Sequence, residues 1–147
     1  LNVDVCLMHM QGNPRIMQIK PSYVDVVDDI KSFFNDRIEV CVNAGISEDK
    51  IVLDPGFGFG KTLNQNLEML KRLSEFKSFN LPVLVGISRK SMIGTLLDNR
   101  NVDGRVSGSV TAAIMAIRNG ANVVRVHDVL ETKDALTIWQ SVNQFKG

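Results

Sequence analysis

Apolar residues along the chain follow two patterns: short continuous runs, and longer segments in which they recur every three or four positions. The short runs are typical of strands buried in a parallel sheet, and they occupy residues 2–9, 50–55, 81–88 and 121–128. The longer segments predict helices over residues 23–44, 63–76, 91–97, 106–119 and 130–145. Gly45 and Gly120 stand where two of these helices are expected to end.

The first two predicted helices carry the clearest apolar stripes. In the first helix the stripe comprises Val24, Val27, Ile30, Phe33, Phe34, Ile38 and Val42, and in the second it comprises Leu63, Leu67, Leu70 and Leu73. Residues at this spacing share one face of a helix, so we expect these side chains to pack against the sheet.

Strands that alternate with helices predict an α/β fold with a parallel sheet covered by helices. No linker, low-complexity stretch or change of composition divides the sequence, so residues 1–147 are interpreted as a single domain. The four strand–helix units amount to half of a (β/α)8 barrel, which needs about 250 residues. An open flavodoxin-like sheet is the competing architecture.

Composition narrows the class of protein without naming a function. The 147 residues include 17 basic and 16 acidic side chains, a formal charge of +1, which does not indicate a nucleic-acid-binding surface. No apolar run approaches the roughly 20 residues of a membrane span, and nothing resembles a signal peptide, so we expect a cytoplasmic protein with no membrane partner. Cys6 and Cys41 lie in apolar contexts without metal-type spacing, and we expect free core thiols.

Each predicted strand turns polar at its carboxyl end, where ligands bind in parallel α/β folds. These ends supply Met8, His9, Asp54, Ser88, Arg89, Lys90, Arg125, His127 and Asp128. Residues two apart in a strand share a face, so Arg125 and His127 are expected to project together. Polar residues often end strands simply because loops are solvated, but here every strand end offers a basic or hydrogen-bonding group.

The segment "LDPGFGFGKT" at residues 53–62 resembles a phosphate-binding loop, but its spacing is wrong. A G-x-x-x-x-G-K-[ST] loop would need its first glycine at Pro55, and proline donates no backbone N–H. The dinucleotide pattern G-x-G-x-x-G also fails, because Gly56, Gly58 and Gly60 are evenly spaced. A carboxylate at a strand end followed by a permissive backbone remains. Phe57 and Phe59 either fold over a ligand or belong to the core of a glycine-rich turn.

The residue types suggest which ligand such a site would take. A carboxylate such as Asp54 can accept two parallel hydrogen bonds from an N–H beside an NH2 group, as in guanine, pterin or guanidinium. Lys90 could neutralise a neighbouring ring atom, and Arg125 with His127 could hold phosphate or diphosphate. The set favours a flat, aminated heterocycle with an anionic tail. A Schiff base at Lys90 and a metal site between His9 and His127 are weaker alternatives, the former because nothing nearby is evidently arranged to lower the pKa of Lys90.

Four motifs together resemble the dihydropteroate synthase family of the bacterial folate pathway. They are "CLMHMQGNPRIMQ", "LDPGFGFGKT", "LVGISRKSMIG" and the pair "RVSGSV" and "RVHDV", in this order along the chain. The resemblance covers residues 1 to about 140 and implies the C-terminal half of the family's (β/α)8 TIM barrel. It also implies the reaction of this transferase, a target of sulfonamides. A hydroxymethyl-dihydropterin diphosphate condenses with p-aminobenzoate to give dihydropteroate and pyrophosphate.

The resemblance implies a role for nine positions. Asp54, Lys90, Met8 and Gly86 match the pterin-binding residues, Arg125 and His127 the diphosphate-binding pair, and Phe59, Ser88, Lys90 and Ser91 the p-aminobenzoate site. Lys90, Arg125 and His127 are the residues that would act in catalysis. No general base is obvious, which is consistent with catalysis by leaving-group stabilisation. Lys61 and Arg89 receive no role.

The resemblance also implies parts that these motifs do not contain. The family's N-terminal half supplies an asparagine at a Mg2+ site, further pterin-binding residues and two mobile loops, so no metal ligand is expected in this chain and the chain alone is expected to be inactive. The family dimerises through its late helices, and the small residues of segment 107–121 would permit close packing there or inside the domain. Two alternatives remain: a pterin-binding methyltransferase barrel, and a non-catalytic half-barrel module.

Overall fold

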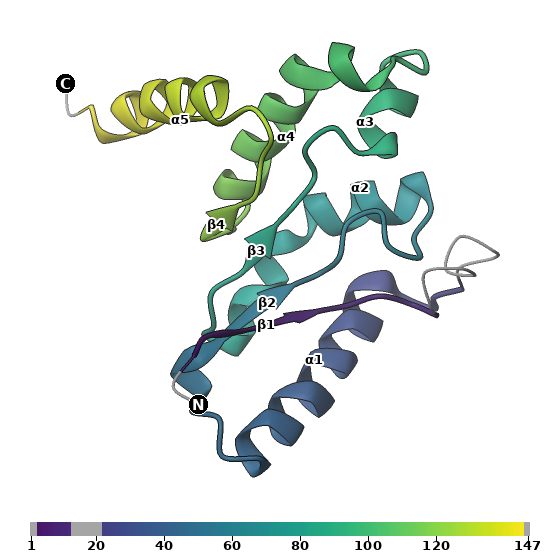
Figure 1. The fold of residues 1–147 in the computed structure, drawn as a ribbon, viewed down its shortest axis with the longest axis vertical. Helices are drawn as coiled ribbons and strands as arrows, with labels where there is room; N and C mark the ends of the chain where they lie inside the picture. The colour runs from purple at the N-terminus through teal and green to yellow at the C-terminus, as the bar shows by residue number, and fades with distance from the viewer. Residues whose placement is uncertain (1–2, 13–21, 146–147) are drawn as a thin grey trace.

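The computed structural model describes residues 3–12 and 22–145. Its strands are β1 (Val5–Met8), β2 (Ile51–Asp54), β3 (Leu84–Val85) and β4 (Val123–Val124), and its α-helices are α1 (Val26–Asn43), α2 (Leu63–Lys71), α3 (Ser91–Leu96), α4 (Val106–Arg118) and α5 (Val129–Gln144), as Figure 1 shows. Short 3-10 helices occupy Glu48–Lys50, Leu73–Phe79 and Val102–Arg105. Strands and helices alternate in the predicted order.

The strands pair in parallel, which confirms the predicted parallel α/β fold. β1 pairs with β2 from Val5–Ile51 to Met8–Asp54, and β3 pairs with β4. A bridge between Leu53 and Val83, with a 2.9 Å hydrogen bond from the Leu53 N–H to the Pro82 carbonyl, connects β2 to the segment before β3. All four carboxyl ends therefore point to the same edge.

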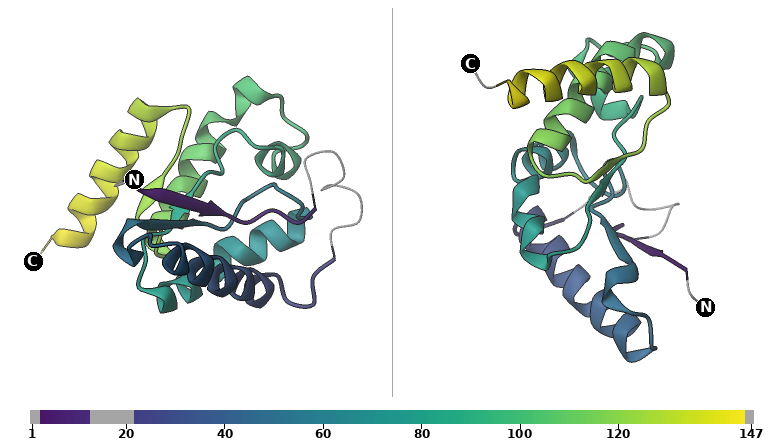
Figure 2. Two further views of the ribbon diagram at one scale, coloured as in Figure 1. Left: turned by 60° about the horizontal axis from the view of Figure 1, so that its bottom comes forward. Right: turned by 90° about the vertical axis from the view of Figure 1, so that its left-hand side faces the viewer.

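The two faces of the sheet differ in burial. Leu53 and Val85 are almost completely buried on one face, and helices α1, α2 and α4 lie on that side (Figure 2). The other face carries Met8 and Val123, whose side chains are 37% and 43% exposed. Because neighbouring residues of a strand point to opposite faces, Met8 and its register partner Asp54 share this open face.

The core lies between the sheet and its helices. Phe34 of α1 is fully buried against Phe76 and Phe79, with edge-on ring contacts at 5.9 Å between centroids. Helix α1 begins where the carboxylate of Asp25 accepts the N–H groups of Val27 and Asp28, and the chain leaves it through Gly45 at a φ of +86°. An N-cap carboxylate and a left-handed glycine are the expected start and end signals of a helix.

Several boundaries differ from the prediction. The helix predicted over 63–76 ends at Lys71, because Arg72 closes it and binds Asp25, Glu68 and Glu75, after which the chain tightens into a 3-10 helix. The runs 81–88 and 121–128 pair over much shorter stretches, because their last residues leave the ladder and form the strand-end loops. Residues 13–18 of the motif "CLMHMQGNPRIMQ" lie outside the described residues.

Four predictions of burial were wrong. Val24 precedes α1 and is fully exposed, Val42 near the end of α1 is 44% exposed, and Leu67 is partly exposed because it lines a groove between helices. Cys6 and Cys41 are free thiols as expected, but Cys6 is exposed rather than in the core, because it points from the open face of the sheet. Among the helices of the described residues, none is long and apolar enough to cross a membrane.

Candidate active site

Asp54 ends β2 with its carboxylate buried beneath the following loop. The carboxylate Oδ1 accepts the N–H of Gly56 at 2.8 Å, and the Asp54 carbonyl accepts the N–H of His9 at 2.9 Å. Burial raises the pKa of Asp54, while the Gly56 N–H and the charges of Lys90, Arg125 and Lys61 act in the opposite direction. The carboxylate therefore lies among cations at the strand ends, with Oδ1 already bonded to the loop.

The glycine-rich loop turns sharply because its glycines adopt left-handed conformations. Gly56 has a φ of +72°, and a Cβ built there would lie 1.9 Å from the carbonyl oxygen of His9, so only glycine fits. Phe57 is fully buried, so the first of the two aromatic residues belongs to the core. Phe59 is half-buried and lies at the site, with the Lys90 ammonium 4.3 Å from its ring centroid.

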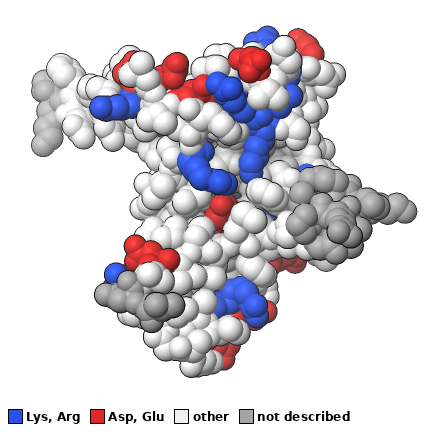
Figure 3. All heavy atoms as spheres, in the orientation of Figure 1, with Lys and Arg blue, Asp and Glu red and all other residues white. Residues whose placement is uncertain are grey.

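A pocket of about 370 Å³ collects basic and hydrogen-bonding groups from the ends of β3 and β4. Its lining comprises Gly86, Ser88, Arg89, Lys90, Val102, Arg125, Val126 and His127. His127 is fixed there, because its backbone N–H donates to Ser88 Oγ at 3.1 Å and its ring Nδ1 lies 3.0 Å from the same atom. A Cβ on Gly86 would lie 3.1 Å from Arg125 Nη2, so the missing side chain makes room for the guanidinium. Figure 3 shows Lys and Arg side chains gathered in the middle of this face of the molecule.

Lys90 lies between the two parts of the site. Its ammonium donates to the carbonyl of Phe57 and lies over the ring of Phe59. Burial lowers the pKa of Lys90 to about 8, with Asp54 raising it and Arg125 lowering it further. The sequence-based premise that nothing depresses this pKa was therefore wrong, since burial alone does so. The Phe57 carbonyl and the Asp54 carboxylate act in the opposite direction and stabilise the ammonium form of Lys90.

Arg89 holds the turn after β3 in place. This residue has a left-handed φ of +56°, and its guanidinium donates to both carboxylate oxygens of Asp128 at 2.5 and 3.1 Å. Its backbone N–H donates to Ser109 Oγ at 2.8 Å, and its carbonyl accepts Arg105 Nη1 at 2.9 Å. Sequence reasoning missed this network because its members are 16 to 39 positions apart.

Ser91 faces a different pocket from Arg125 and His127. It lies at the start of the short helix α3 and lines a hollow of about 230 Å³ beside Gly58, Lys61, Asn66 and Thr95. Lys61 and Asn66 are buried in this region, and sequence reasoning assigned a role to neither. The signal for Asn66 was weak, since a polar residue in a helix is usually solvated; here its side chain accepts the Gly58 N–H at 2.7 Å.

A metal site does not fit the residues that the structure describes. Within residues 3–12 and 22–145, no three His, Cys, Asp or Glu side chains lie close enough to hold an ion. His9 lies 3.0 Å from Lys61 Nζ, and His127 is bonded to Ser88. The alternative of a metal site between His9 and His127 therefore finds no support among the described residues.

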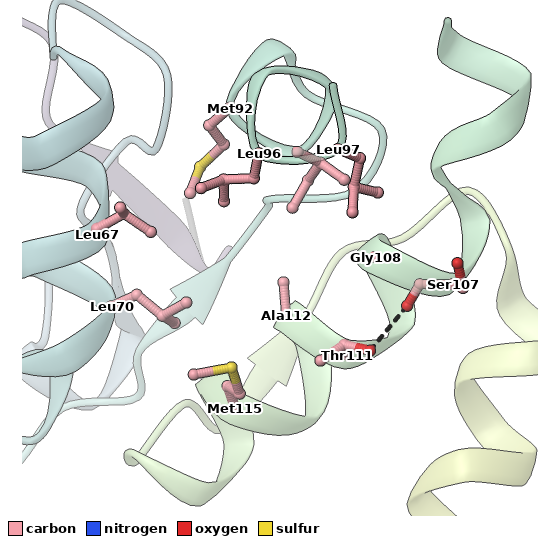
Figure 4. A pocket seen from close by; sticks show the side chains of 11 residues that line it. Leu67, Leu70, Met92, Leu96, Leu97, Ser107, Gly108, Thr111, Ala112 and Met115 are labelled. Carbon is pink, nitrogen blue, oxygen red and sulfur yellow. Dashed lines mark hydrogen bonds between the residues drawn. The ribbon is translucent and has the colours of Figure 1, made fainter. Parts of the chain in front are cut away.

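An apolar groove of about 330 Å³ lies between helices α2, α3 and α4, away from the strand ends (Figure 4). Its lining is mainly aliphatic, from Leu67, Leu70, Met92, Leu96, Leu97 and Met115 among others. The small residues of α4 pack inside the domain here: Ala112 and Ala116 are buried, and a Cβ on Gly108 would lie 2.7 Å from Ile93. The lining residues include no charged side chain, and the polar ones are Ser107 and Thr111.

The model of one protein family, described as pterin binding enzyme, matches residues 1–127. The chain belongs to this family. It is 54% identical to dihydropteroate synthase of Escherichia coli over 136 residues, which cover 92% of this chain and 48% of that protein. The resemblance to dihydropteroate synthases is thereby confirmed.

Solved structures of the pterin-binding enzymes agree with this assignment. Yersinia pestis dihydropteroate synthase, solved as a sulfonamide drug complex, superposes with a TM-score of 0.94 at 52% identity, covering 97% of this chain and 52% of that one. The Xanthomonas albilineans enzyme in complex with 7,8-dihydropteroate gives a TM-score of 0.90 at 42% identity, covering 98% and 52%. The chain thus spans about half the length of the relatives it matches.

Proposed function

We propose that this chain forms the C-terminal half of a (β/α)8 barrel and carries the strand-end site of a dihydropteroate synthase. In this reaction a hydroxymethyl-dihydropterin diphosphate and p-aminobenzoate yield dihydropteroate and pyrophosphate. The observation that carries the proposal is the meeting of a buried carboxylate, Asp54, with Lys90, Arg125 and His127 at one edge of the sheet. A diphosphate pocket beside a carboxylate also favours this reaction over methyl transfer.

The pterin ring is held at the open face of the sheet in this account. Asp54 accepts the amino group and the adjacent ring N–H, a pair of charge-assisted hydrogen bonds. Its burial strengthens such bonds, since water competes poorly there. Met8, its register partner, packs beside the ring, and Gly86 lets the ring approach the backbone.

The diphosphate enters the pocket of about 370 Å³ in which Arg125 and His127 lie. As the bond between the exocyclic carbon and the diphosphate oxygen breaks, the electron pair leaves with pyrophosphate. Arg125 and His127 stabilise this growing negative charge, and Ser88 holds the imidazole in position. The amine nitrogen of p-aminobenzoate then attacks the carbon, and its proton leaves with pyrophosphate or water.

The second substrate is placed on the other side of Lys90. Phe59 packs on the ring of p-aminobenzoate, while Ser88, Lys90 and Ser91 provide polar contacts around it. Support comes from the position of Lys90, whose ammonium lies over the Phe59 ring. Ser91, which lines the pocket of about 230 Å³, follows Lys90 directly in the sequence.

Two further parts of the proposal concern the whole protein. We propose a homodimer through the late helices, supported by Leu130, Ile138 and Val142 of α5 and by Phe145 just after it, which are all more than 60% exposed. A cytoplasmic location is supported by the free thiols of Cys6 and Cys41. The Mg2+ ligand is proposed to come from outside the residues that the structure describes.

A hybrid enzyme tests the proposed reaction. This chain would replace the matching segment of Escherichia coli dihydropteroate synthase, and pyrophosphate release would be measured with both substrates present. We expect turnover in the hybrid and a loss of roughly 100-fold or more in Arg125→Met, because removing one donor to a developing anion typically costs this much.

Arg118→Met is the matched control for this assay, since Arg118 is an exposed arginine in the last turn of α4. We expect its turnover to equal that of the unmodified hybrid. A folded hybrid without turnover, or an Arg125→Met variant as active as the control, would contradict the proposed function.

A further inference from the structure

Lys61 is a buried lysine whose ammonium has three acceptors. The residue is only 4% exposed, and its Nζ lies 3.0 Å from His9 Nδ1. The same Nζ donates to the carbonyls of Gly56 at 2.9 Å and Phe59 at 3.0 Å. An ammonium would donate to all three partners, with His9 Nδ1 as the acceptor, whereas a neutral amine would donate to the two carbonyls and accept from a protonated His9 Nδ1.

These three contacts tie the end of β1 to the loop that follows β2. Gly56 is the shared element, because its N–H holds the Asp54 carboxylate at 2.8 Å while its carbonyl accepts Lys61. His9, the second partner of Lys61, also donates its backbone N–H to the Asp54 carbonyl. Lys61 and Asp54 thus bond to the same residue of the turn, Lys61 to the Gly56 carbonyl and Asp54 to the Gly56 N–H.

The third contact reaches the aromatic residue of the site. Lys61 binds the carbonyl of Phe59, whose ring lies 4.3 Å from the ammonium of Lys90. Lys90 in turn donates to the carbonyl of Phe57 in the same loop. The positions of the Phe59 ring and of Lys90 therefore both depend on the conformation of residues 56–59, which Lys61 holds through the carbonyls of Gly56 and Phe59.

Charge and burial are consistent with this arrangement. Burial lowers the pKa of His9 to about 3, with the charge of Lys61 adding to the effect, so its ring is neutral at physiological pH. Burial lowers the pKa of Lys61 to about 7, and the nearby Asp54 carboxylate opposes this. A neutral His9 whose Nδ1 accepts from Lys61 must carry its proton on Nε2.

We propose that Lys61 is a positioning residue, whose buried ammonium fixes the His9 tautomer and the loop so that Asp54 and Phe59 are presented correctly to the two substrates. This inference rests on the proposed function for the identity of the ligands. The tautomer and the loop geometry are independent of it.

Nitrogen NMR of the His9 ring tests the structural half in the 147-residue chain. We expect a neutral ring with its proton on Nε2, no titration near the ordinary pKa of 6.5, and a changed Nδ1 resonance in Lys61→Met. Lys71→Met, which removes an exposed lysine from α2, is the control and should leave these resonances unchanged. A His9 ring with its proton on Nδ1, or an ordinary titration, overturns the proposal even if Lys61→Met does not fold.

Binding of 7,8-dihydropteroate to the hybrid enzyme, measured by calorimetry, tests the positioning half. We expect Lys61→Met to bind at least about tenfold more weakly than Lys71→Met. Asn66→Leu removes the side-chain oxygen that accepts the Gly58 N–H and leaves the partners of Lys61 in place. Nitrogen NMR of this variant should therefore show the wild-type tautomer of His9. Equal affinity in Lys61→Met and Lys71→Met would overturn the proposal. Failure of the unmodified hybrid to bind would contradict the proposed function instead, and the His9 tautomer would then show whether Lys61 acts on the loop as proposed.

Discussion

At the strand ends, burial acts on single side chains in opposite directions. It raises the pKa of Asp54 and lowers those of Lys61 and His9, so each group is pushed toward its neutral form. The opposite charges of Asp54 and Lys61 act against this for both groups. His9 has no such compensation, because its neighbours are the cation of Lys61 and the rings of Tyr23 and Phe33.

The lowered pKa of His9 predicts a specific loss of stability in acid. Its folded pKa of about 3 lies below the ordinary 6.5, so the unfolded chain binds more protons between these values. The contribution of His9 is fully present above pH 6.5 and is lost as the pH falls toward 3, by up to about 1.4 kcal/mol per pH unit. His9→Asn keeps an acceptor without a titratable ring, and urea unfolding from pH 7 to pH 4 should show a shallower decline. Parallel declines in the two proteins would refute this.

At the scale of single residues, the sequence predicted which residues lie at the strand ends better than it predicted their burial. The strand-end position of Asp54, Ser88 and Lys90 followed from the apolar runs and the polar residues that end them. The burial of Phe57 and Lys61 did not, because both depend on which way a glycine-rich loop folds over β1. A lysine after such a loop is normally solvated, and only the position of His9 shows why this one is not.

At the scale of elements, local capping sets where the helices begin beside the site. Helix α2 starts at a capping box, in which Thr62 Oγ1 accepts the Gln65 N–H at 3.3 Å and Gln65 Oε1 accepts the Thr62 N–H at 2.8 Å. This cap follows Lys61 directly, so the same turn ends the loop and starts the helix. The order of the elements could be read from the sequence, because apolar periodicity is local.

The length of the elements could not be read in this way. The strands β3 and β4 are short because the residues after them are drawn into contacts across the sheet, such as that of His127 with Ser88. Helix α2 is shorter than its apolar stripe suggests, because Arg72 finds acidic partners on two elements. Both effects depend on tertiary contacts that periodicity does not contain.

The capping box predicts a modest stability change at one residue. Thr62→Ala removes the acceptor for one of the unpaired N–H groups of α2 and should lower the free energy of unfolding by about 1 kcal/mol. Thr137→Ala is the control, since the hydroxyl of Thr137 only bonds back to the Lys133 carbonyl within α5, and it should change stability by less than about 0.5 kcal/mol. Urea denaturation of both variants measures the difference, and equal midpoints would argue against a stabilising cap.

At the scale of the whole molecule, the sheet has one covered face and one open face. The helices bury Leu53 and Val85, while Met8 and Val123 face outward from the other side. The predicted residues Met8, Asp54, Gly86 and Arg125 gather at the carboxyl edge of this open face, with Lys90 between them. Their proximity follows from parallel pairing alone, which is why the sequence could predict it.

Calorimetric titration of the hybrid enzyme with 7,8-dihydropteroate tests the central claim most directly, because it asks whether this edge binds a pterin through Asp54. We predict saturable binding by the unmodified hybrid and by its Asp4→Asn variant, which alters an exposed carboxylate before β1. Asp54→Asn should bind at least about tenfold more weakly, since it loses the charge that accepts the pterin N–H groups. Equal affinity of the Asp54→Asn and Asp4→Asn variants would contradict the account.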